Sequence, residues 1–420
     1  MPERDTIPIA RLQTADQALG RLACALLQPL RWKRRWLRLR PSCPDRILAI
    51  KFWGIGSLQL LTPAVRALRE RSPGARIDLL TLRENEAFAR SLGVFDEVRT
   101  IDVATASWSR LLARLYHLVR ALRRSRYGEV IDFEFFTHFS AIVTALSGAP
   151  RTRGFAAPGL GRGRFHRATV PFNRYWHVAR NFRLLAAGRD SGDVTSAELT
   201  PPRVTSAARE RVARVLGEHG IEATSGFVVL NANAGRLSLE RRWPAERFAE
   251  LARRLVTEDG LRVVLVGAPA ERAHVARVAA LARPLPHGFL LDLAGELSID
   301  ELVALLERAN AVVSNDSGPM HVAAALETPT VGLFGPETPV MYAPLGTRAR
   351  ALWEPPICSP CINVHDNKLA TCIHGRPECL LAIGVEAVLD ETRRALWDGV
   401  LHAVPRAAMG AALAREGPVA

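Results

Sequence analysis

Apolar positions in the first half of the chain form short continuous runs, separated by longer segments with helical spacing. The runs RILAI, RIDLL and EVIDF, with a short one near FDEVRT, predict β-strands. Residues 58–71 and 107–124 predict helices between them, and a further helix is expected at 175–187. A Gly/Arg-rich loop precedes that last helix and a polar stretch follows it.

The second half alternates in the same way. The runs FVVLNAN, RVVLVGA, FLLDLAG, AVVSN and TVGLFG predict strands. Helices are expected at 244–257, 271–281, in SIDELVALLERA and at 319–326. The first and last of these open with proline, whose missing N–H costs nothing in a first turn. Ser298 and Glu301 match a capping box at the start of the third.

Strands that are apolar along their whole length are typical of parallel sheets covered by helices on both faces, so the predicted class is α/β. Because 420 residues are many for one core, we expect two Rossmann-like, doubly wound domains facing a cleft. Their ligands should bind at the carboxyl ends of the strands. The predicted segments are a basic N-terminal extension (1–44), a first domain (45–190), a linker (191–205), a second domain (206–356) and a C-terminal segment with cysteines and helices (357–420).

The charged residues, 56 Lys and Arg against 42 Asp and Glu, leave a formal net charge of +14. Such a surface favours anionic partners, such as phosphorylated ligands, acidic membranes or nucleic acid. The sequence has neither the aromatic platform nor the finger spacing of nucleic-acid modules, so we expect no nucleic-acid partner.

No apolar run is long enough to span a bilayer, and the basic block RWKRRWLRLR follows the apolar LACALLQPL. This order reverses that of a secretory signal, so we expect a cytoplasmic protein. Residues 17–39 fit a basic amphipathic helix with Trp32 and Trp36 one turn apart, a pattern typical of peripheral contact with the inner membrane. A basic extension packed on the body of the protein is an equal alternative, because Pro29 interrupts the pattern.

The loop after the first strand, FWGIGSLQ, carries Gly54 and Gly56. A dinucleotide fingerprint would need a third glycine where Gln59 stands, and a P-loop would need Gly-Lys-Ser/Thr. By itself the loop is therefore best interpreted as a strand-to-helix turn that uses glycine for a positive φ.

A second loop, in VVSNDSGPMHVAAALETPTVGLFGP, predicts an anion site. The helix that begins near Gly318 should present free N–H groups, Ser317 can donate a hydrogen bond, and His321 lies in the first turn. Asp316 fits such a site only if it binds a hydroxyl or caps backbone donors. The alternative is a capped core helix with a satisfied histidine, but the combination at a sheet edge favours the anion site.

Two further segments offer ligands for a nucleotide. Arg241 and Arg242 precede a predicted helix and can neutralise a diphosphate leaving group, although a solvated basic pair is common. Glu271 follows the next strand and can accept hydrogen bonds from a ribose. Its local sequence favours the alternative of a surface helix residue.

Four cysteines are spaced C-x2-C-x10-C-x6-C, at Cys358, Cys361, Cys372 and Cys379. Four thiolates this close in sequence suit a structural Zn or Fe ion in a reducing cytoplasm. Disulfides, or buried thiols in an irregular segment, are the alternatives.

These segments together resemble glycosyltransferase family 9, the heptosyltransferases of lipopolysaccharide core synthesis and their relatives. The resemblance covers residues 46–388 and is carried by NDSGPMHVAAALETPTVGLFGP, RRWP, ILAIKFWGIGSLQLLTPAVRAL and EVIDFEFF. The motif D-[ST]-G-x-x-H-x-A-A within the first of these segments is a specific signal of the family. Some relatives carry similar cysteines near the same point.

The resemblance implies a GT-B fold with the acceptor on the first domain and a nucleotide-diphosphate sugar on the second. It implies inverting transfer from ADP-heptose to an anionic glycolipid of the lipopolysaccharide core, with no cofactor or metal required for catalysis. By position, the implied donor site has Ser317, Gly318 and His321 at the diphosphate, Arg241 in place of a phosphate-binding Lys, Glu271 near the ribose, and Asp316 as the donor-side Asp.

One position departs from the family, which normally reads Gly-Asp where this chain has Gly56-Ser57, and that Asp is the proposed general base. A serine hydroxyl is a poor base without its own activator. We hypothesise that Glu134, where the family often has Gln, replaces the base, with Asp132 as a second candidate. The alternative for Glu134 is a hydrogen-bonded polar group beside a turn. Alternatively, proton loss is late, so that a weak acceptor suffices for an oxocarbenium-like transition state.

Two other functions stay open. The chain can be a family member that uses another nucleotide sugar, or a different glycan or protein acceptor. It can also be a pseudo-transferase that binds a donor without transferring the sugar, because it lacks the usual Asp.

Overall fold

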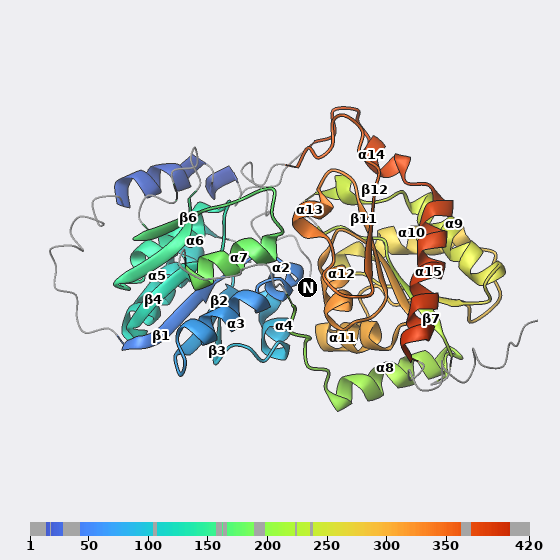
Figure 1. Cartoon of the computed structure of the whole chain (residues 1–420), viewed down its shortest axis with the longest axis horizontal. Coiled ribbons are helices and arrows are strands. Elements are labelled where there is room, and N and C mark those ends of the chain that lie inside the picture. The colour runs from blue at the N-terminus through green and yellow to red at the C-terminus, as the bar shows by residue number, and fades with distance from the viewer. Residues whose placement is uncertain are drawn as a thin grey trace, which may run out of the picture. The chain divides into compact units, whose positions relative to one another are not determined.

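The computed structural model describes residues 14–16, 18–27, 43–103, 107–156, 162, 166–188, 198–222, 225–235, 238–362 and 371–403. The chain divides into two compact units, the first built mainly on Met1–Arg203 and the second on Val204–Pro339, Ala343–Ser359 and Cys372–Ala420. Each unit holds one sheet with its own helices (Figure 1).

The first unit contains a six-stranded parallel sheet in the order β3-β2-β1-β4-β5-β6. Its strands are β1 (Cys43–Ile50), β2 (Arg76–Leu82), β3 (Glu97–Ile101), β4 (Tyr127–Asp132), β5 (Arg151–Ala156) and β6 (Ala168–Pro171). Its labelled helices are α2 (Ile55–Gln59), α3 (Thr62–Arg71), α4 (Glu86–Ser91), α5 (Trp108–Ser125), α6 (His138–Leu146) and α7 (Val178–Ala187).

The second unit repeats this plan in the order β12-β11-β10-β7-β8-β9, again with parallel pairs. Its strands are β7 (Phe227–Asn231), β8 (Arg262–Leu265), β9 (Leu290–Asp292), β10 (Ala311–Asn315), β11 (Thr330–Phe334) and β12 (Ala349–Trp353). The helices of this half of the chain are α8 (Ser206–Glu218), α9 (Ala245–Thr257), α10 (Arg272–Ala282), α11 (Ile299–Arg308), α12 (Gly318–Ala325), α13 (Pro339–Tyr342), α14 (Glu378–Ala382) and α15 (Val385–Ala403).

Strand order reverses once in each sheet. The chain starts on the central strand β1, builds outward through β2 and β3, and then returns to β4 on the other side. In the second sheet, β7 and β10 have the same relation. The loops after these paired strands therefore leave in opposite directions and open a crevice at the carboxyl ends, which is where ligands of open α/β sheets bind.

The predicted α/β class with parallel sheets is confirmed, while three strands were missed. These are β5, β6 and β12, and none is a continuous apolar run; β5, for example, reads RTRGFA. The predicted helix at 58–71 is in fact two helices, α2 and α3.

The N-terminal helical residues described at 14–16 and 18–27 pack on α6. Cys24 is buried against Ala141 and Ala145 of that helix. The Asp16 carboxylate accepts hydrogen bonds from the backbone N–H of His138 at 2.9 Å and of Phe139 at 2.7 Å, and so caps α6. Trp32 and Trp36 of the predicted helix lie outside the described residues, among which no helix is long and apolar enough to cross a membrane.

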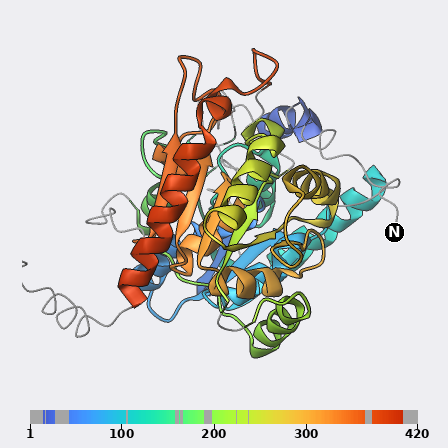
Figure 2. The same cartoon turned by 90° about the vertical axis from the view of Figure 1, so that its right-hand side faces the viewer.

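The C-terminal part of the second unit is held to its core by Trp243, which is fully buried just before α9. Its ring packs edge-on against Phe248 with centroids 5.0 Å apart, and its Nε1–H donates to the carbonyl of Ile383 at 3.0 Å. Figure 2 shows α15, which follows Ile383, running beside α9. The loop that carries Arg241 and Arg242 therefore shares its packing with α15.

We expect Trp243→Phe to lower the free energy of unfolding of the second unit by about 2 kcal/mol, because it removes a buried hydrogen bond and leaves unfilled volume. Trp397→Phe on α15 is the matched control; this side chain is 67% exposed, so the change should stay within about 0.5 kcal/mol. Urea denaturation measures both, and equal losses in the two variants would contradict the packing role of Trp243.

Candidate active site

The crevice of the second sheet is lined by polar side chains from the loops after β7 and β10. Asn231 Nδ2 donates to Ser314 Oγ at 2.9 Å and to Ser317 Oγ at 2.7 Å, so it joins the two loops. Asn233 Nδ2 donates to the carbonyl of Val266 at 3.0 Å, so the loop after β7 is also bonded to the residue that follows β8. Asn231 and Asn233 were missed in the sequence, although their position directly after an apolar strand is a usable signal.

Helix α12 begins at Gly318, three residues after the end of β10, so its N-terminus lies at the carboxyl end of the sheet. Ser317 is the N-cap residue, but its side chain makes no capping hydrogen bond, and Pro319 follows in the first turn. The N–H groups of a first turn have no partner within the helix, so they favour an anion. His321 is buried on the same helix, as expected for either of its predicted roles.

Arg241 bridges the two loops of the crevice. Its Nη1 donates to the carbonyl of Asp316 at 2.8 Å and to the Asp316 carboxylate Oδ2 at 3.2 Å, and its Nη2 donates to the carbonyl of Ala234 at 2.5 Å. The guanidinium therefore has a fixed orientation beside the start of α12. Asp316, which looked out of place beside an anion, is the residue that holds this arginine.

Arg242 and Glu271 also lie together, with Arg242 Nη2 3.7 Å from Glu271 Oε1. The other carboxylate oxygen of Glu271 accepts from the N–H of Ala268 at 2.9 Å, so it caps the turn after β8. His274, which the sequence did not single out, has Nε2 3.2 Å from the carbonyl of Ala232. Burial lowers the pKa of His274, and the nearby charge of Arg242 adds to the effect, so this ring favours the neutral form.

In the first sheet, the crevice between β1 and β4 contains a buried ion pair. Glu134 Oε1 accepts from Lys51 Nζ at 2.8 Å, from the N–H of Phe52 at 2.7 Å and from the N–H of Trp53 at 3.2 Å. The side chains of Lys51 and Glu134 are 1% and 0% exposed. Oε1 already has three donors, while Oε2 is buried with no hydrogen-bond partner among the described residues. The three contacts of Oε1 favour an anchoring role for Glu134.

Asp132 belongs to a second buried cluster directly beside Glu134. Its Oδ2 lies 2.6 Å from Arg162 Nη2 and 3.0 Å from Ser140 Oγ, while its Oδ1 accepts from the N–H of Glu134. Burial raises the pKa of Asp132 to about 6, against the opposing charge of Arg162. His166, 3.7 Å from Asp132, has its pKa lowered to about 3 by burial and by Arg162. The sequence did not single out Arg162 or His166.

Ser57 lies in α2, immediately after the turn that Glu134 holds, and its side chain is half-buried. Gly54 at the start of α2 has φ of 72°, which confirms the expected use of glycine for a positive φ. Among the predicted catalytic residues, the structure therefore joins Asp132 to Glu134 and leaves Ser57 as the partly accessible one.

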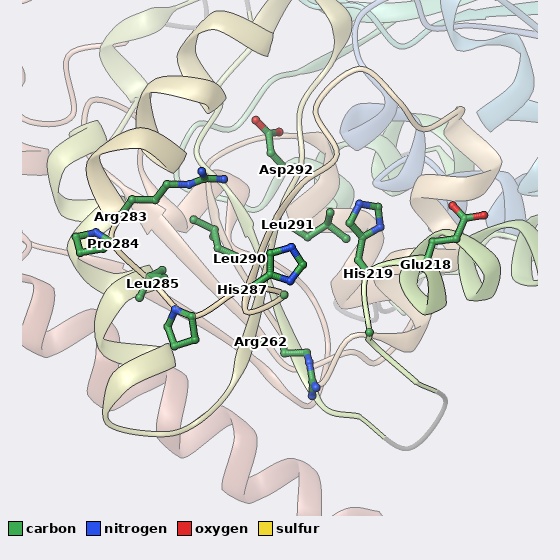
Figure 3. Close-up of a pocket in the computed structure, with 13 residues that line it drawn as sticks. Glu218, His219, Arg262, Arg283, Pro284, Leu285, His287, Leu290, Leu291 and Asp292 are labelled. Carbon is green, nitrogen blue, oxygen red and sulfur yellow. The ribbon is translucent and has the colours of Figure 1, made fainter.

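A separate cavity of about 1050 Å³ lies in the second unit, beside the start of β8 at Arg262 and along β9. Figure 3 shows it lined by loop residues including His219, Arg283 and His287. None of the candidate site residues lines this cavity, so it does not belong to the candidate site.

Comparison with known proteins identifies the family. The family described as "Glycosyltransferase family 9 (heptosyltransferase)" matches residues 115–371, which is more than half of the chain. This chain belongs to glycosyltransferase family 9. It is therefore a glycosyltransferase, as the motif from Asp316 to His321 indicated.

Three relatives illustrate the similarity. Lipopolysaccharide heptosyltransferase 2 of Escherichia coli K12 is 27% identical over 316 residues, which cover 73% of this chain and 87% of the relative. The structure of E. coli ADP-heptose lps heptosyltransferase II aligns with a TM-score of 0.68 at 23% identity, over 84% of this chain and 99% of that one. The structure of the iron-containing dodecameric glycosyltransferase TibC from enterotoxigenic E. coli H10407 aligns with a TM-score of 0.51 at 13% identity, over 87% of this chain and 78% of that one. The predicted GT-B fold is confirmed.

Of the segment that carries the four cysteines of this family 9 enzyme, the described part omits 363–370, between Cys361 and Cys372. Cys379 is buried, Cys361 is exposed, and the Cys372 thiol donates to the carbonyl of Arg376 at 2.9 Å. None of the four is in a disulfide, and no three His, Cys, Asp or Glu side chains of the described segments form a metal-binding group. The predicted Zn or Fe site therefore stays a prediction.

We expect Glu134→Gln to destabilise the family 9 enzyme by about 3 kcal/mol, because it leaves the buried Lys51 ammonium without its counter-charge. Thermal unfolding measures the loss, and Glu198→Gln, at an ion pair with Arg66 that is exposed, is the matched control with little change. If Glu134 is an anchor, the variant should retain most of its turnover well below its Tm. A folded variant of unchanged Tm that has lost turnover would instead make Glu134 the base.

The buried cluster also predicts two opposite pH dependences. His166 is neutral in the native state, so the stability it confers is lost as the pH falls from about 6.5 towards 3. Asp132 is protonated more readily in the native than in the unfolded state, so its contribution grows as the pH falls from about 6 to 4. Each effect amounts to about 1.4 kcal/mol per pH unit, and in the wild type the two largely cancel.

Single variants should separate these contributions. Between pH 6 and pH 4, His166→Gln should gain stability relative to wild type, and Asp132→Asn should lose it. Urea unfolding at pH 6, 5 and 4, followed by circular dichroism, measures the slopes. Parallel profiles for the two variants would contradict the assigned protonation states.

Proposed function

We propose that this enzyme transfers a heptose from ADP-heptose to a lipopolysaccharide core-type acceptor, with inversion at the anomeric carbon. The observation that carries the proposal is the anion site in the crevice of the second unit, where Arg241 is fixed beside the N-terminus of α12. The names of the similar proteins, lipopolysaccharide heptosyltransferase 2 and ADP-heptose lps heptosyltransferase II, support this donor and this acceptor class.

The donor would bind with its diphosphate at the first turn of α12. The Ser317 hydroxyl and the Gly318 N–H can donate to phosphate oxygens, and Gly318 has no Cβ to obstruct their approach. Arg241 can add a charge-assisted hydrogen bond, and His321 lies in the same turn. Glu271, which keeps Oε1 available beside Arg242, is the candidate for the ribose hydroxyls.

In the transfer step, an acceptor hydroxyl oxygen attacks the anomeric carbon while the bond from that carbon to the diphosphate oxygen breaks. ADP leaves with the electron pair, and the α12 N-terminus and Arg241 stabilise the growing negative charge. Because Glu134 holds the turn, we place Ser57 next to the acceptor hydroxyl as a weak hydrogen-bond acceptor. The proton is then lost late, to solvent, from a transition state with oxocarbenium character.

The acceptor would be an anionic glycolipid bound on the first unit, which fits the formal net charge of +14. Such an acceptor implies a cytoplasmic enzyme working at the inner membrane. A structural Zn or Fe ion on Cys358, Cys361, Cys372 and Cys379 stays a prediction that elemental analysis decides, and no step of the proposed reaction uses it.

We expect calorimetry to show binding of ADP-heptose in preference to UDP-sugars, in the micromolar to millimolar range common for enzyme substrates, roughly 1 μM to 1 mM. Arg241→Ala should weaken donor binding by about 10- to 100-fold, the value of one or two hydrogen bonds to a charged group. Arg277→Ala, at a side chain that is 65% exposed on α10, is the control and should bind as the wild type does.

Transfer to extracted lipopolysaccharide acceptor completes this test. Preferential binding of another nucleotide sugar would shift the function to a different donor. Donor binding without transfer or donor hydrolysis would indicate a pseudo-transferase, and failure to bind any nucleotide sugar would overturn the proposed function.

A further inference from the structure

Helix α5 of the first unit is only shallowly packed. Of its 18 residues only Leu122 is fully buried. Leu115 and Leu118 pack partly buried against the core cluster below the helix. Most of the helix surface is therefore presented to solvent. A solvated helix face is usually polar throughout, whereas this one carries large apolar side chains.

The exposed side of α5 carries an apolar stripe. Trp108, Leu112 and Tyr116 are 48%, 64% and 60% exposed, and they follow one another at intervals of four residues. Such spacing keeps them within an arc of about 80° on one side of the helix. Three large exposed apolar side chains in a row form a patch, which is unlike the scattered single residues of a normal surface.

The same row continues as a basic stripe. Arg120 and Arg124 occupy the next two positions at intervals of four, and both are exposed. Arg120 Nη1 lies 3.4 Å from the Tyr116 hydroxyl, which joins the two halves of the row. The sequence of α5 contains five arginines and no Asp or Glu, so no acidic residue of the helix offsets this charge.

The N-terminal helical residues present a second patch of this kind. Leu19, Leu22 and Leu26 are 63%, 58% and 70% exposed, while Cys24 on the opposite side is buried on α6. Helix α5 adjoins the same α6, because Arg123 Nε donates to the carbonyl of Leu146 at 2.8 Å. Both patches are therefore carried by elements packed on one helix of the first unit.

We propose that the exposed face of α5 docks on an anionic lipid bilayer, with Trp108, Leu112 and Tyr116 in the interface and Arg120 and Arg124 on the lipid headgroups. Aromatic residues with an apolar body and a polar edge favour this boundary, and arginines beside them match its negative charge. A second copy of the chain fits less well, because the two basic stripes would repel each other. This inference does not depend on which sugar the enzyme transfers.

Vesicle flotation of the full chain tests the proposal. We expect binding to vesicles of phosphatidylcholine with 30% phosphatidylglycerol and little binding to pure phosphatidylcholine, with the difference shrinking in high salt. The variant Trp108→Ser/Leu112→Ser/Tyr116→Ser should bind roughly tenfold or more weakly. The variant Arg120→Gln/Arg124→Gln should bind anionic vesicles about fivefold more weakly for each charge removed.

Matched controls lie on the second unit. Leu281→Ser/Trp397→Ser removes exposed apolar side chains from α10 and α15, and Arg211→Gln/Arg214→Gln removes exposed charges from α8. Both should bind vesicles as the wild type does. Thermal unfolding and donor binding of every variant establish that it is folded.

Three results would overturn the proposal. One is no binding of the wild type to anionic vesicles, and another is undiminished binding by the folded α5 variants. The third is a concentration-dependent increase in mass in solution that the triple α5 variant abolishes, because α5 would then be an interface between copies. None of these outcomes bears on the donor-binding test, so the two proposals fail separately.

Discussion

The reversal of strand order at the centre of each sheet is the constraint on which this structure depends. Two loops diverge there from adjacent strands, and their backbone groups have no ladder partner. Side chains that are buried or partly buried supply the missing partners. In the first unit Glu134 accepts from the N–H groups of Phe52 and Trp53, and in the second unit Arg241 donates to the carbonyls of Ala234 and Asp316.

These partners decide which groups remain for chemistry. The carboxylate of Glu134 neutralises Lys51 through Oε1, and that of Asp132 is paired with Arg162, so both buried acids of the first crevice have a cationic partner. In the second crevice the opposite holds, since the acid, Asp316, serves to orient an arginine beside the start of α12. Under the proposed function, this leaves one crevice without a committed base and one prepared for a negative charge, which would suit departure of a diphosphate more than strong activation of a nucleophile.

Much of this was predictable because it rests on local patterns. Central strands are buried on both faces, so they appear as continuous apolar runs, whereas β5, with its arginines and glycine, leaves no such mark. The turn that precedes α12 was predictable from Asp316, Ser317 and Gly318 because a helix start has its own sequence signals. By contrast, Arg162 and His166 lie in a segment with no regular pattern, and their burial beside Asp132 has no local signal.

By itself the sequence determined the α/β class, the two sheets, and the motif that leads to glycosyltransferase family 9. The tertiary structure alone decided the partners of the charged residues. Lys51 and Glu134 are 83 residues apart in the chain, and their contact depends on β1 lying beside β4. By sequence, Glu134 was therefore a candidate base. In the fold its carboxylate is the counter-charge of Lys51, because a buried lysine in a low-dielectric position must be neutralised.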